Sequence, residues 1–137
     1  MTIFYIVLDT NVLISSLWGG TPKKIIDLWK KSKLKLLVSD EIVSEYNVVL
    51  KRFQFPNEFY VEFLDVLSNS ECTIRVNPHK NFYLIKDDPA DNKFLDCAFK
   101  GHADYIISGD KHLKCLKKFE GIEILSPSLF IKKFGTL

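Results

Sequence analysis

The segment that decides the fold is IFYIVLDTN, residues 3–11. Its first six residues are aromatic, β-branched or leucine, without glycine, proline or polar alternation, which predicts a strand buried on both faces. Three small polar residues, Asp9, Thr10 and Asn11, end this strand and favour a turn into the N-cap of a helix. A buried strand followed directly by a helix indicates an α/β protein.

The same strand-to-helix pattern recurs along the 137 residues. Strands are expected at 3–8, 34–38, 72–76, 105–108 and 122–125, and helices at 11–17, 22–32, 40–53, from 56, 91–102, 111–118 and 127–134. Thr21 is the expected N-cap of the second helix, with Pro22 at its first position. Strands alternating with helices predict one domain, residues 1–137, with a parallel sheet covered by helices on both faces.

Composition excludes several classes of protein. The 19 Lys and Arg residues nearly balance 17 Asp and Glu residues, and the net charge of +2 does not by itself indicate a nucleic-acid binder. No apolar run reaches the roughly 20 residues that span a bilayer, and no signal peptide is seen, so we expect a cytoplasmic protein without membrane contact. Three cysteines without CxxC spacing argue against disulfides and a thiolate zinc site, and Cys97 and Cys115 are expected in the core.

Acidic residues stand where a parallel sheet binds its ligands. Asp9 and Asp110 each follow a strand directly, and ligands of such sheets bind at the carboxyl ends of the strands, although each Asp alone also suits a cap or a turn. Glu45 lies at the border of an apolar helical stripe, and Asp91 and Asp96 belong to one later helix. Gathered carboxylates repel one another, and a hard divalent ion, Mg²⁺ or Mn²⁺, relieves that repulsion.

Four segments together resemble a known family. They are LDTNVL (8–13), Ser44-Glu45, DPADNKFLDCA (88–98) and ADYIISGDKHL (103–113). In this order they resemble the PIN domain, and within that family the chain is most similar to stand-alone prokaryotic nucleases classed as VapC-like toxins. The resemblance implies a three-layer α/β/α sandwich with a central parallel sheet of four to five strands.

The resemblance also implies an activity, hydrolysis of RNA phosphodiester bonds by a metal-dependent endoribonuclease. Four acids match the family's catalytic and metal-binding residues and would hold one or two Mg²⁺ or Mn²⁺ ions: Asp9, Glu45, Asp91 and Asp110. Asn11 and Ser108 match the small polar residues beside them. The family further implies a small antitoxin protein as a partner, and relatives often form homodimers.

Two roles remain open beside these. Asp96 lies about 140° around the helix from Asp91, so it either binds a second ion or faces another way. Lys111 and Lys114 begin a lysine-rich stretch directly after Asp110, which suits contact with RNA phosphates, although a solvated helix face explains it as well.

Competing hypotheses differ in residues that can be named. A phosphatase of the haloacid dehalogenase type needs a second Asp two residues after the first, where this chain has Asn11. A PIN-like module that binds RNA or protein without cutting is the main alternative, and the intact set of four acids argues against it. A group of aromatic residues suits either the core or a dimer face: Trp18, Trp29, Phe53, Phe55, Phe59 and Phe63.

Overall fold

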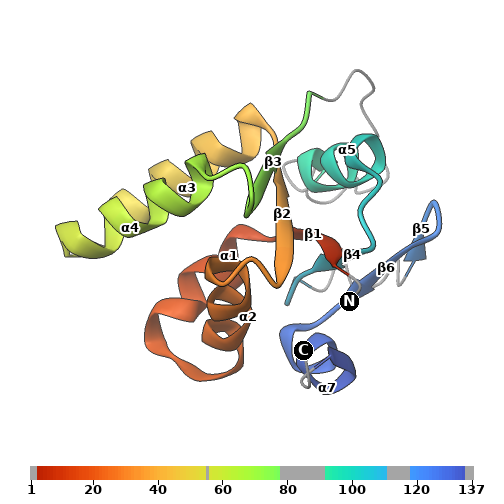
Figure 1. Ribbon diagram of the computed structural model, residues 1–137, viewed down its shortest axis with the longest axis horizontal. Coiled ribbons are helices and arrows are strands. Elements are labelled where there is room, and N and C mark those ends of the chain that lie inside the picture. The colour runs from red at the N-terminus through yellow and green to blue at the C-terminus, as the bar shows by residue number, and fades with distance from the viewer. Residues whose placement is uncertain (1–2, 55, 78–91, 111–117, 135–137) are drawn as a thin grey trace.

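The computed structural model describes residues 3–54, 56–77, 92–110 and 118–134 (Figure 1). Its elements are β1 (Phe4–Leu8), α1 (Thr10–Ser15), the 3₁₀ turn η1 (Ser16–Trp18), α2 (Gly20–Lys30), β2 (Leu34–Val38), α3 (Asp40–Arg52), α4 (Asn57–Ser68), β3 (Thr73–Arg75), α5 (Asn92–Gly101), β4 (Tyr105–Ile107), β5 (Lys118–Phe119), β6 (Ile122–Leu125) and α7 (Pro127–Phe134). The expected strands and helices of the described segments are thus present, most with small shifts at their ends.

Within the described residues, the sheet has six strands in the order β3-β2-β1-β4-β6-β5. The first five are parallel, which confirms the expected central sheet. The short strand β5 is antiparallel to β6 and was not expected, because residues 111–118 were assigned to a helix. That assignment is wrong at Lys118, and residues 111–117 lie outside the described segments. Positive φ angles at Glu120 (50°) and Gly121 (82°) form the tight turn that pairs β5 with β6.

Helices cover both faces of this sheet, as expected. The chain places β2 and then β3 on one side of β1, and it returns across the sheet through α5 to place β4 on the other side. Right-handed crossovers in opposite directions put their helices on opposite faces. Accordingly, α5 packs on β1, β2 and β4, whereas α2 packs on β2 and on α7 (Figure 1). The result is the predicted α/β/α sandwich.

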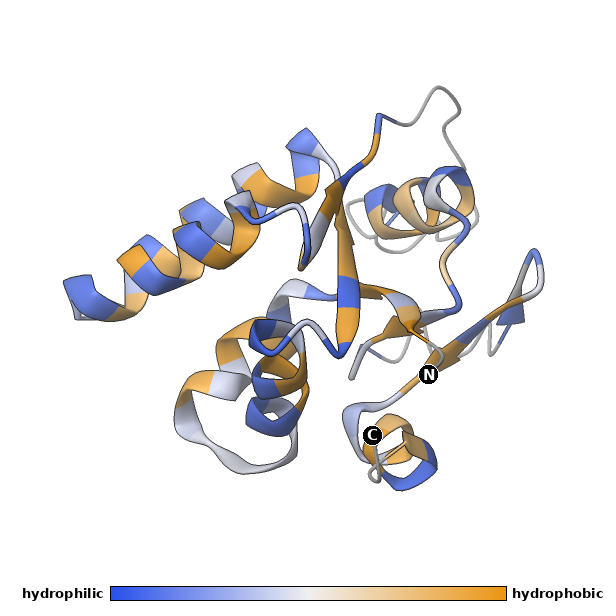
Figure 2. Ribbon diagram, in the orientation of Figure 1, coloured by the Kyte–Doolittle hydropathy of each residue, from blue (hydrophilic) through white to orange (hydrophobic). Residues whose placement is uncertain are grey.

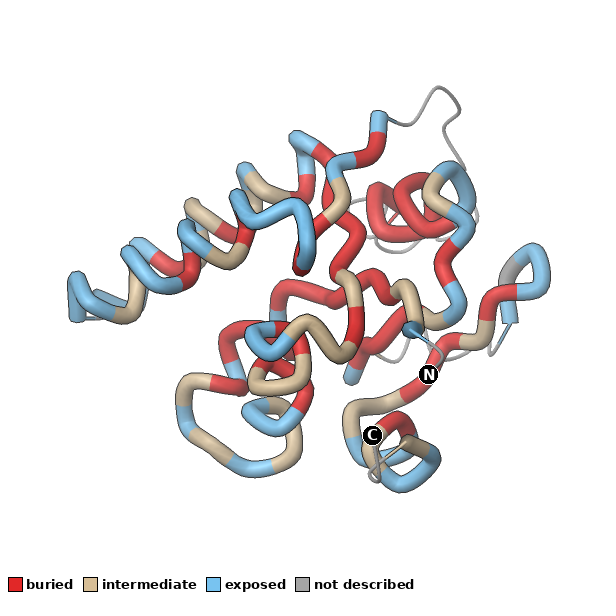
Figure 3. The backbone as a smooth tube through the Cα atoms, in the orientation of Figure 1, coloured by how far each residue is buried: buried red, intermediate tan, exposed pale blue. Residues whose placement is uncertain are grey.

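The core follows the central strand. Ile6, Val7 and Leu8 of β1 are at most 1% exposed, because β1 has a strand on either side and helices on both faces (Figure 3). Cys97 on α5 is a buried free thiol, which confirms its expected core position, while Cys115 lies outside the described residues. No helix in the described part of the chain combines the length and apolar character that crossing a bilayer requires.

The start of α2 differs from the prediction. The helix begins at Gly20 with Gly19 as its N-cap, rather than at Pro22 after a Thr21 cap. Gly19 has φ 86° and Gly20 has φ 73°, a left-handed backbone that costs glycine little. The chain therefore turns two residues earlier than the Thr-Pro signal indicated.

Helices α3 and α4 run alongside one another and extend beyond the sheet, each with an apolar and a polar side (Figures 1 and 2).

The aromatic residues that suit either the core or a dimer face divide between the core and the surface. Trp29 and Phe63 are buried with ring centroids 5.9 Å apart, and Trp29 Nε1 donates to Thr73 Oγ1 at 3.1 Å. Trp18 and Phe53 also contact each other, yet they are 67% and 45% exposed. Phe59 is partly buried, and Phe55 lies outside the described residues.

Candidate active site at the carboxyl edge of the sheet

The site lies where the strand order reverses. On one side of β1 in the sheet lies β2, the next strand in the chain. On its other side lies β4, which begins almost a hundred residues after β1 ends. Leu8 pairs with Ile107 at the carboxyl ends of these two strands, and the Asp9 amide donates to the Ile107 carbonyl at 3.0 Å. Such a reversal leaves a crevice between diverging connections, which is the usual ligand site of an open α/β sheet. Asp9, Ser108 and Asp110 all follow this strand pair.

Asp9 caps a helix and also lies at the centre of the candidate site. Its extended backbone (φ −63°, ψ 141°) makes it the N-cap of α1, and its Oδ1 accepts the Asn11 amide at 3.3 Å. Its Oδ2 accepts the Ser108 hydroxyl at 2.6 Å, across 99 residues of sequence. The residue is only 3% exposed. The capping explanation that the sequence left open is therefore correct, and it leaves the second carboxylate oxygen directed toward β4.

Ser108 connects the two strand-end acids. It is fully buried, and while its hydroxyl donates to Asp9, the same oxygen accepts the Asp110 amide at 2.9 Å. A hydroxyl can donate and accept at once, so one side chain sets the position of both neighbours. Asp110 itself is partly exposed at the end of this turn.

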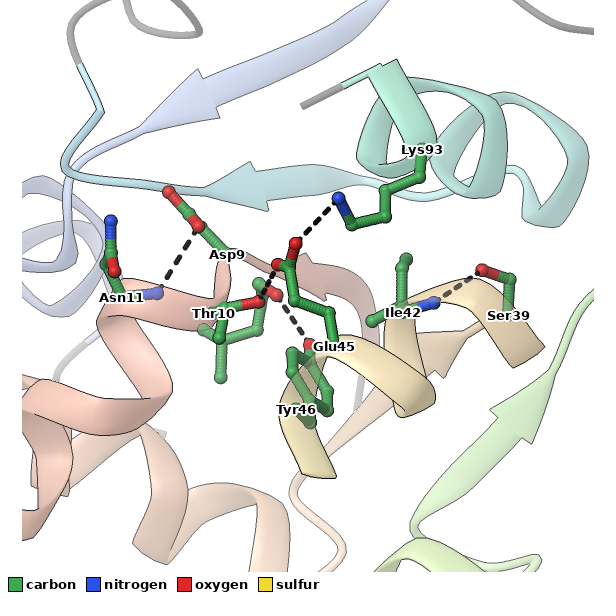
Figure 4. A network of polar contacts seen from close by, with 9 residues as sticks. Asp9, Thr10, Asn11, Ser39, Ile42, Glu45, Tyr46 and Lys93 are labelled. Atoms are coloured by element: carbon green, nitrogen blue, oxygen red, sulfur yellow. Dashed lines mark hydrogen bonds and ion pairs between the residues drawn. The ribbon is translucent and has the colours of Figure 1, made fainter. Parts of the chain in front are cut away.

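Glu45 reaches the same edge from α3. The helix begins after Ser39, whose hydroxyl accepts the Ile42 amide at 3.2 Å (Figure 4). One turn later the Glu45 carboxylate accepts the Thr10 hydroxyl on Oε2 and forms an ion pair with the Lys93 ammonium at 2.7 Å on Oε1. The Glu45 side chain is 31% exposed and that of Lys93 only 6%. The helix is fixed to β1 by Tyr46, whose hydroxyl donates to the Leu8 carbonyl at 2.5 Å.

These carboxylates influence one another. Burial raises the pKa of Asp9 above its ordinary value, and the charges of Asp110 and Glu45 raise it further. The hydrogen bonds from Ser108 and the Asn11 amide oppose part of this increase in the pKa, because they stabilise the charged form. Negative charge is therefore concentrated around a largely buried Asp9.

The family model of the PIN domain matches residues 5–112, which include both strand-end acids and Glu45. The chain belongs to the PIN domain family. Among solved structures, this PIN domain is similar to the crystal structure of PAE2754 from Pyrobaculum aerophilum, with a TM-score of 0.56 and 14% identity over 97% of this chain and 90% of that one. At that identity the likeness shows the fold alone. No curated protein matches the chain. PIN domains are generally nucleases, and the family typically uses divalent metal ions.

The donor atoms of this PIN domain are those that a hard divalent cation prefers. Asp9, Glu45 and Asp110 offer carboxylate oxygens, and a cation between them would relieve the repulsion that adds to the effect of burial on the pKa of Asp9. Within the described residues, no three His, Cys, Asp or Glu side chains are arranged to hold a metal ion. The fourth predicted acid, Asp91, lies outside those residues.

The remaining predicted residues of the PIN domain are placed as follows. Asn11 is exposed at the start of α1, and it contributes its backbone amide to Asp9. Asp96 is buried on α5, where its charge and, more strongly, burial raise the pKa of the Cys97 thiol to about 12. Lys111 and Lys114 fall outside the described residues.

Two residues that contact Glu45 were not predicted from the sequence. They are Thr10 and Lys93. Thr10 had been interpreted only as part of the turn after β1. A signal for Lys93 was present, because it directly precedes Phe94 and Leu95 in a helix that is buried from Asn92 to Ala98. A lysine that is buried needs a carboxylate partner, and the structure supplies Glu45.

Proposed function

We propose that this PIN domain is a Mg²⁺- or Mn²⁺-dependent endoribonuclease that hydrolyses phosphodiester bonds of RNA. The observation that carries the proposal is Asp9 at the reversal of strand order, buried and hydrogen-bonded to Ser108, where burial raises its pKa and the charges of Asp110 and Glu45 add to that increase. Structural capping of α1 needs no second and third carboxylate. A nuclease site does need them, because metal ions bound there activate water and offset the charge of the phosphate.

In this proposal Asp9, Glu45, Asp91 and Asp110 hold one or two metal ions. When bound, the ions supply an activated water and stabilise the leaving oxygen. Asp9 acts in its deprotonated form, and the Ser108 hydroxyl keeps one of its oxygens in a fixed direction. The products carry a 5′-phosphate and a 3′-hydroxyl.

Three further roles belong to the proposal. Asn11 supports Asp9, and Asp96, buried on α5, is a candidate ligand of a second ion. Lys111 and Lys114 bind RNA phosphates beside Asp110, which their place in the sequence supports.

The decisive test incubates the purified chain with end-labelled RNA in Mg²⁺, in Mn²⁺ and in EDTA. We expect internal cleavage with either ion, none in EDTA, and none with Asp9→Asn under any condition. Near-normal cleavage by Asp9→Asn would refute the assignment. RNA that is bound but never cut would instead support a PIN module that binds without catalysis.

We also propose a biological setting, the toxin component of a cytoplasmic toxin–antitoxin pair. Its support is the resemblance of the motifs to VapC-like proteins. Co-expression with the product of the adjacent gene tests it, and we expect a stable complex in which RNA cleavage is inhibited. If no complex forms and cleavage is not inhibited, the toxin role is contradicted, and the proposed nuclease activity is unaffected.

A homodimer is the second assembly that we propose. Its support is the exposed aromatic pair Trp18 and Phe53, which lies at the C-terminal end of the projecting helix α3. We expect light scattering to give twice the monomer mass for the wild-type chain, and a monomer for the Trp18→Ser/Phe53→Ser variant. A wild-type monomer would contradict this proposal.

A further inference from the structure

A lysine lies inside the acidic site. Lys93, in the first turn of α5, has a side chain that is 6% exposed, and its ammonium is 5.1 Å from the centroid of the Phe94 ring. Removing a charged ammonium from water is unfavourable unless a partner compensates it. Its ion pair with Glu45, at 2.7 Å, supplies that compensation (Figure 4).

The same ion pair also fixes the position of the Glu45 carboxylate. One carboxylate oxygen of Glu45 forms the ion pair with the Lys93 ammonium, and the other accepts a hydrogen bond from the Thr10 hydroxyl. Thr10 is only 3% exposed. Glu45 is thus held by contacts from two neighbouring elements, α5 and α1. Its negative charge is nevertheless felt at Asp9, whose pKa it helps to raise. The ammonium therefore offsets negative charge that Asp9, Glu45 and Asp110 bring together.

We propose that Lys93 is a positioning residue, a built-in counter-ion that keeps Glu45 in place without metal and lowers the affinity of the site for divalent ions. The inference rests on the metal site of the proposed function. Positive charge beside Glu45 repels an incoming cation, and the ion must share or take over the oxygen that the ammonium contacts. A carboxylate oxygen has two lone pairs, so sharing is geometrically permitted.

The test is Mn²⁺ binding measured by titration calorimetry, without RNA. Lys93→Met keeps the aliphatic stem of the side chain and removes the charge, and we expect it to bind Mn²⁺ about tenfold more tightly, since one nearby unit charge is removed. The matched control is Lys100→Met, which removes the same charge from an exposed position of the same helix. We expect the control to bind Mn²⁺ as the wild-type chain does, because exposed charges are screened.

A second readout separates a counter-ion from a merely structural lysine. In EDTA, Lys93→Met is expected to melt at a lower temperature than Lys100→Met, and saturating Mn²⁺ should raise its Tm more than it raises that of the wild-type chain. Unchanged or weaker Mn²⁺ affinity in Lys93→Met overturns the inference. Absence of Mn²⁺ binding by the wild-type chain refutes the metal site itself, and with it the inference.

A second pair of variants covers the case in which Lys93→Met does not fold. Glu45→Gln retains the buried ammonium, and Glu45→Gln/Lys93→Met removes both charges, which restores a neutral pair in the interior. The double variant should bind Mn²⁺ more tightly than Glu45→Gln alone. Equal or weaker binding by the double variant overturns the inference.

Discussion

Two aspartates sit at opposite ends of the same pair of strands. Beyond the amino end of the β1–β4 pairing, Asp104 accepts the Tyr5 amide on Oδ2 at 2.8 Å, and its own amide donates to the Tyr5 carbonyl at 2.7 Å. Beyond the carboxyl end, Asp9 accepts the Ser108 hydroxyl, and its own amide donates to the Ile107 carbonyl. Each side-chain bond joins residues 99 positions apart.

What differs is the environment of the two carboxylates. Asp104 is exposed to solvent, whereas Asp9 is 3% exposed with the charges of Asp110 and Glu45 close by. A hydrogen-bonded carboxylate that stays in water, such as Asp104 at the end of a strand pair, takes little from the stability of the fold. A buried carboxylate among like charges destabilises the fold, and such a cost is typical of a functional site. Within a single pair of strands, the environment of Asp104 therefore suits a structural role, whereas that of Asp9 suits the proposed metal site.

The largest expected difference is in activity. Asp9→Asn should abolish RNA cleavage, because the amide cannot serve as an anionic metal ligand. Asp104→Asn keeps an oxygen that can accept the Tyr5 amide, and it should cleave as the wild-type chain does. Parallel cleavage assays in Mn²⁺, with circular dichroism to confirm folding, measure this difference. Loss of activity in both variants would show that the two aspartates do not differ in function.

The second expected effect is on stability as a function of pH, in EDTA. Because the pKa of Asp9 is raised in the folded state, the folded protein keeps this proton to higher pH than the unfolded chain does. The free energy of unfolding should therefore fall as pH rises from the ordinary value of 3.8 through the raised pKa. Urea titrations across that range should show a fall in the wild-type chain that Asp9→Asn lacks. An equal fall in both proteins would show that Asp9 is not its source.

Ser108→Ala should have an intermediate effect. The variant loses the hydroxyl that donates to Asp9 and accepts the Asp110 amide, which we expect to cost about 1–2 kcal/mol of unfolding free energy. It also removes a bond that lowers the pKa of Asp9, so the acid limb of the cleavage rate should move to higher pH. Ser108→Thr retains the hydroxyl and serves as the control. An unmoved acid limb in Ser108→Ala would contradict the bridging role.

The smallest effect is expected at the solvated end. Asp104→Ala loses the bond to the Tyr5 amide, and water can replace it, so the free energy of unfolding should fall by about 1 kcal/mol or less. Cleavage should be unchanged. Thermal melts of this variant beside Ser108→Ala measure the contrast, and an equal loss in the two would remove the distinction between the ends of the sheet.

Much of the architecture was predictable because its causes are local. The apolar run of residues 3–8 and the polar turn that follows predicted β1 and the start of α1. Strand β5 was not predicted, since two residues carry no periodicity and their pairing depends on the turn at Glu120 and Gly121. The prediction of Asp9 and Asp110 as site residues was likewise local in origin, because both follow strands, whereas Glu45 and Asp91 were predicted from the resemblance to the family.

The sequence by itself determined which acids end strands, because turn chemistry and hydrophobic periodicity act over a few residues. Only the tertiary structure decided that β1 lies beside β4, which brings Asp9 to Ser108 across 99 positions. It also decided that Lys93 is buried against Glu45, since that contact depends on the packing of α5 near α3. Burial and neighbouring charge, which give a carboxylate its chemistry, are properties of that packing.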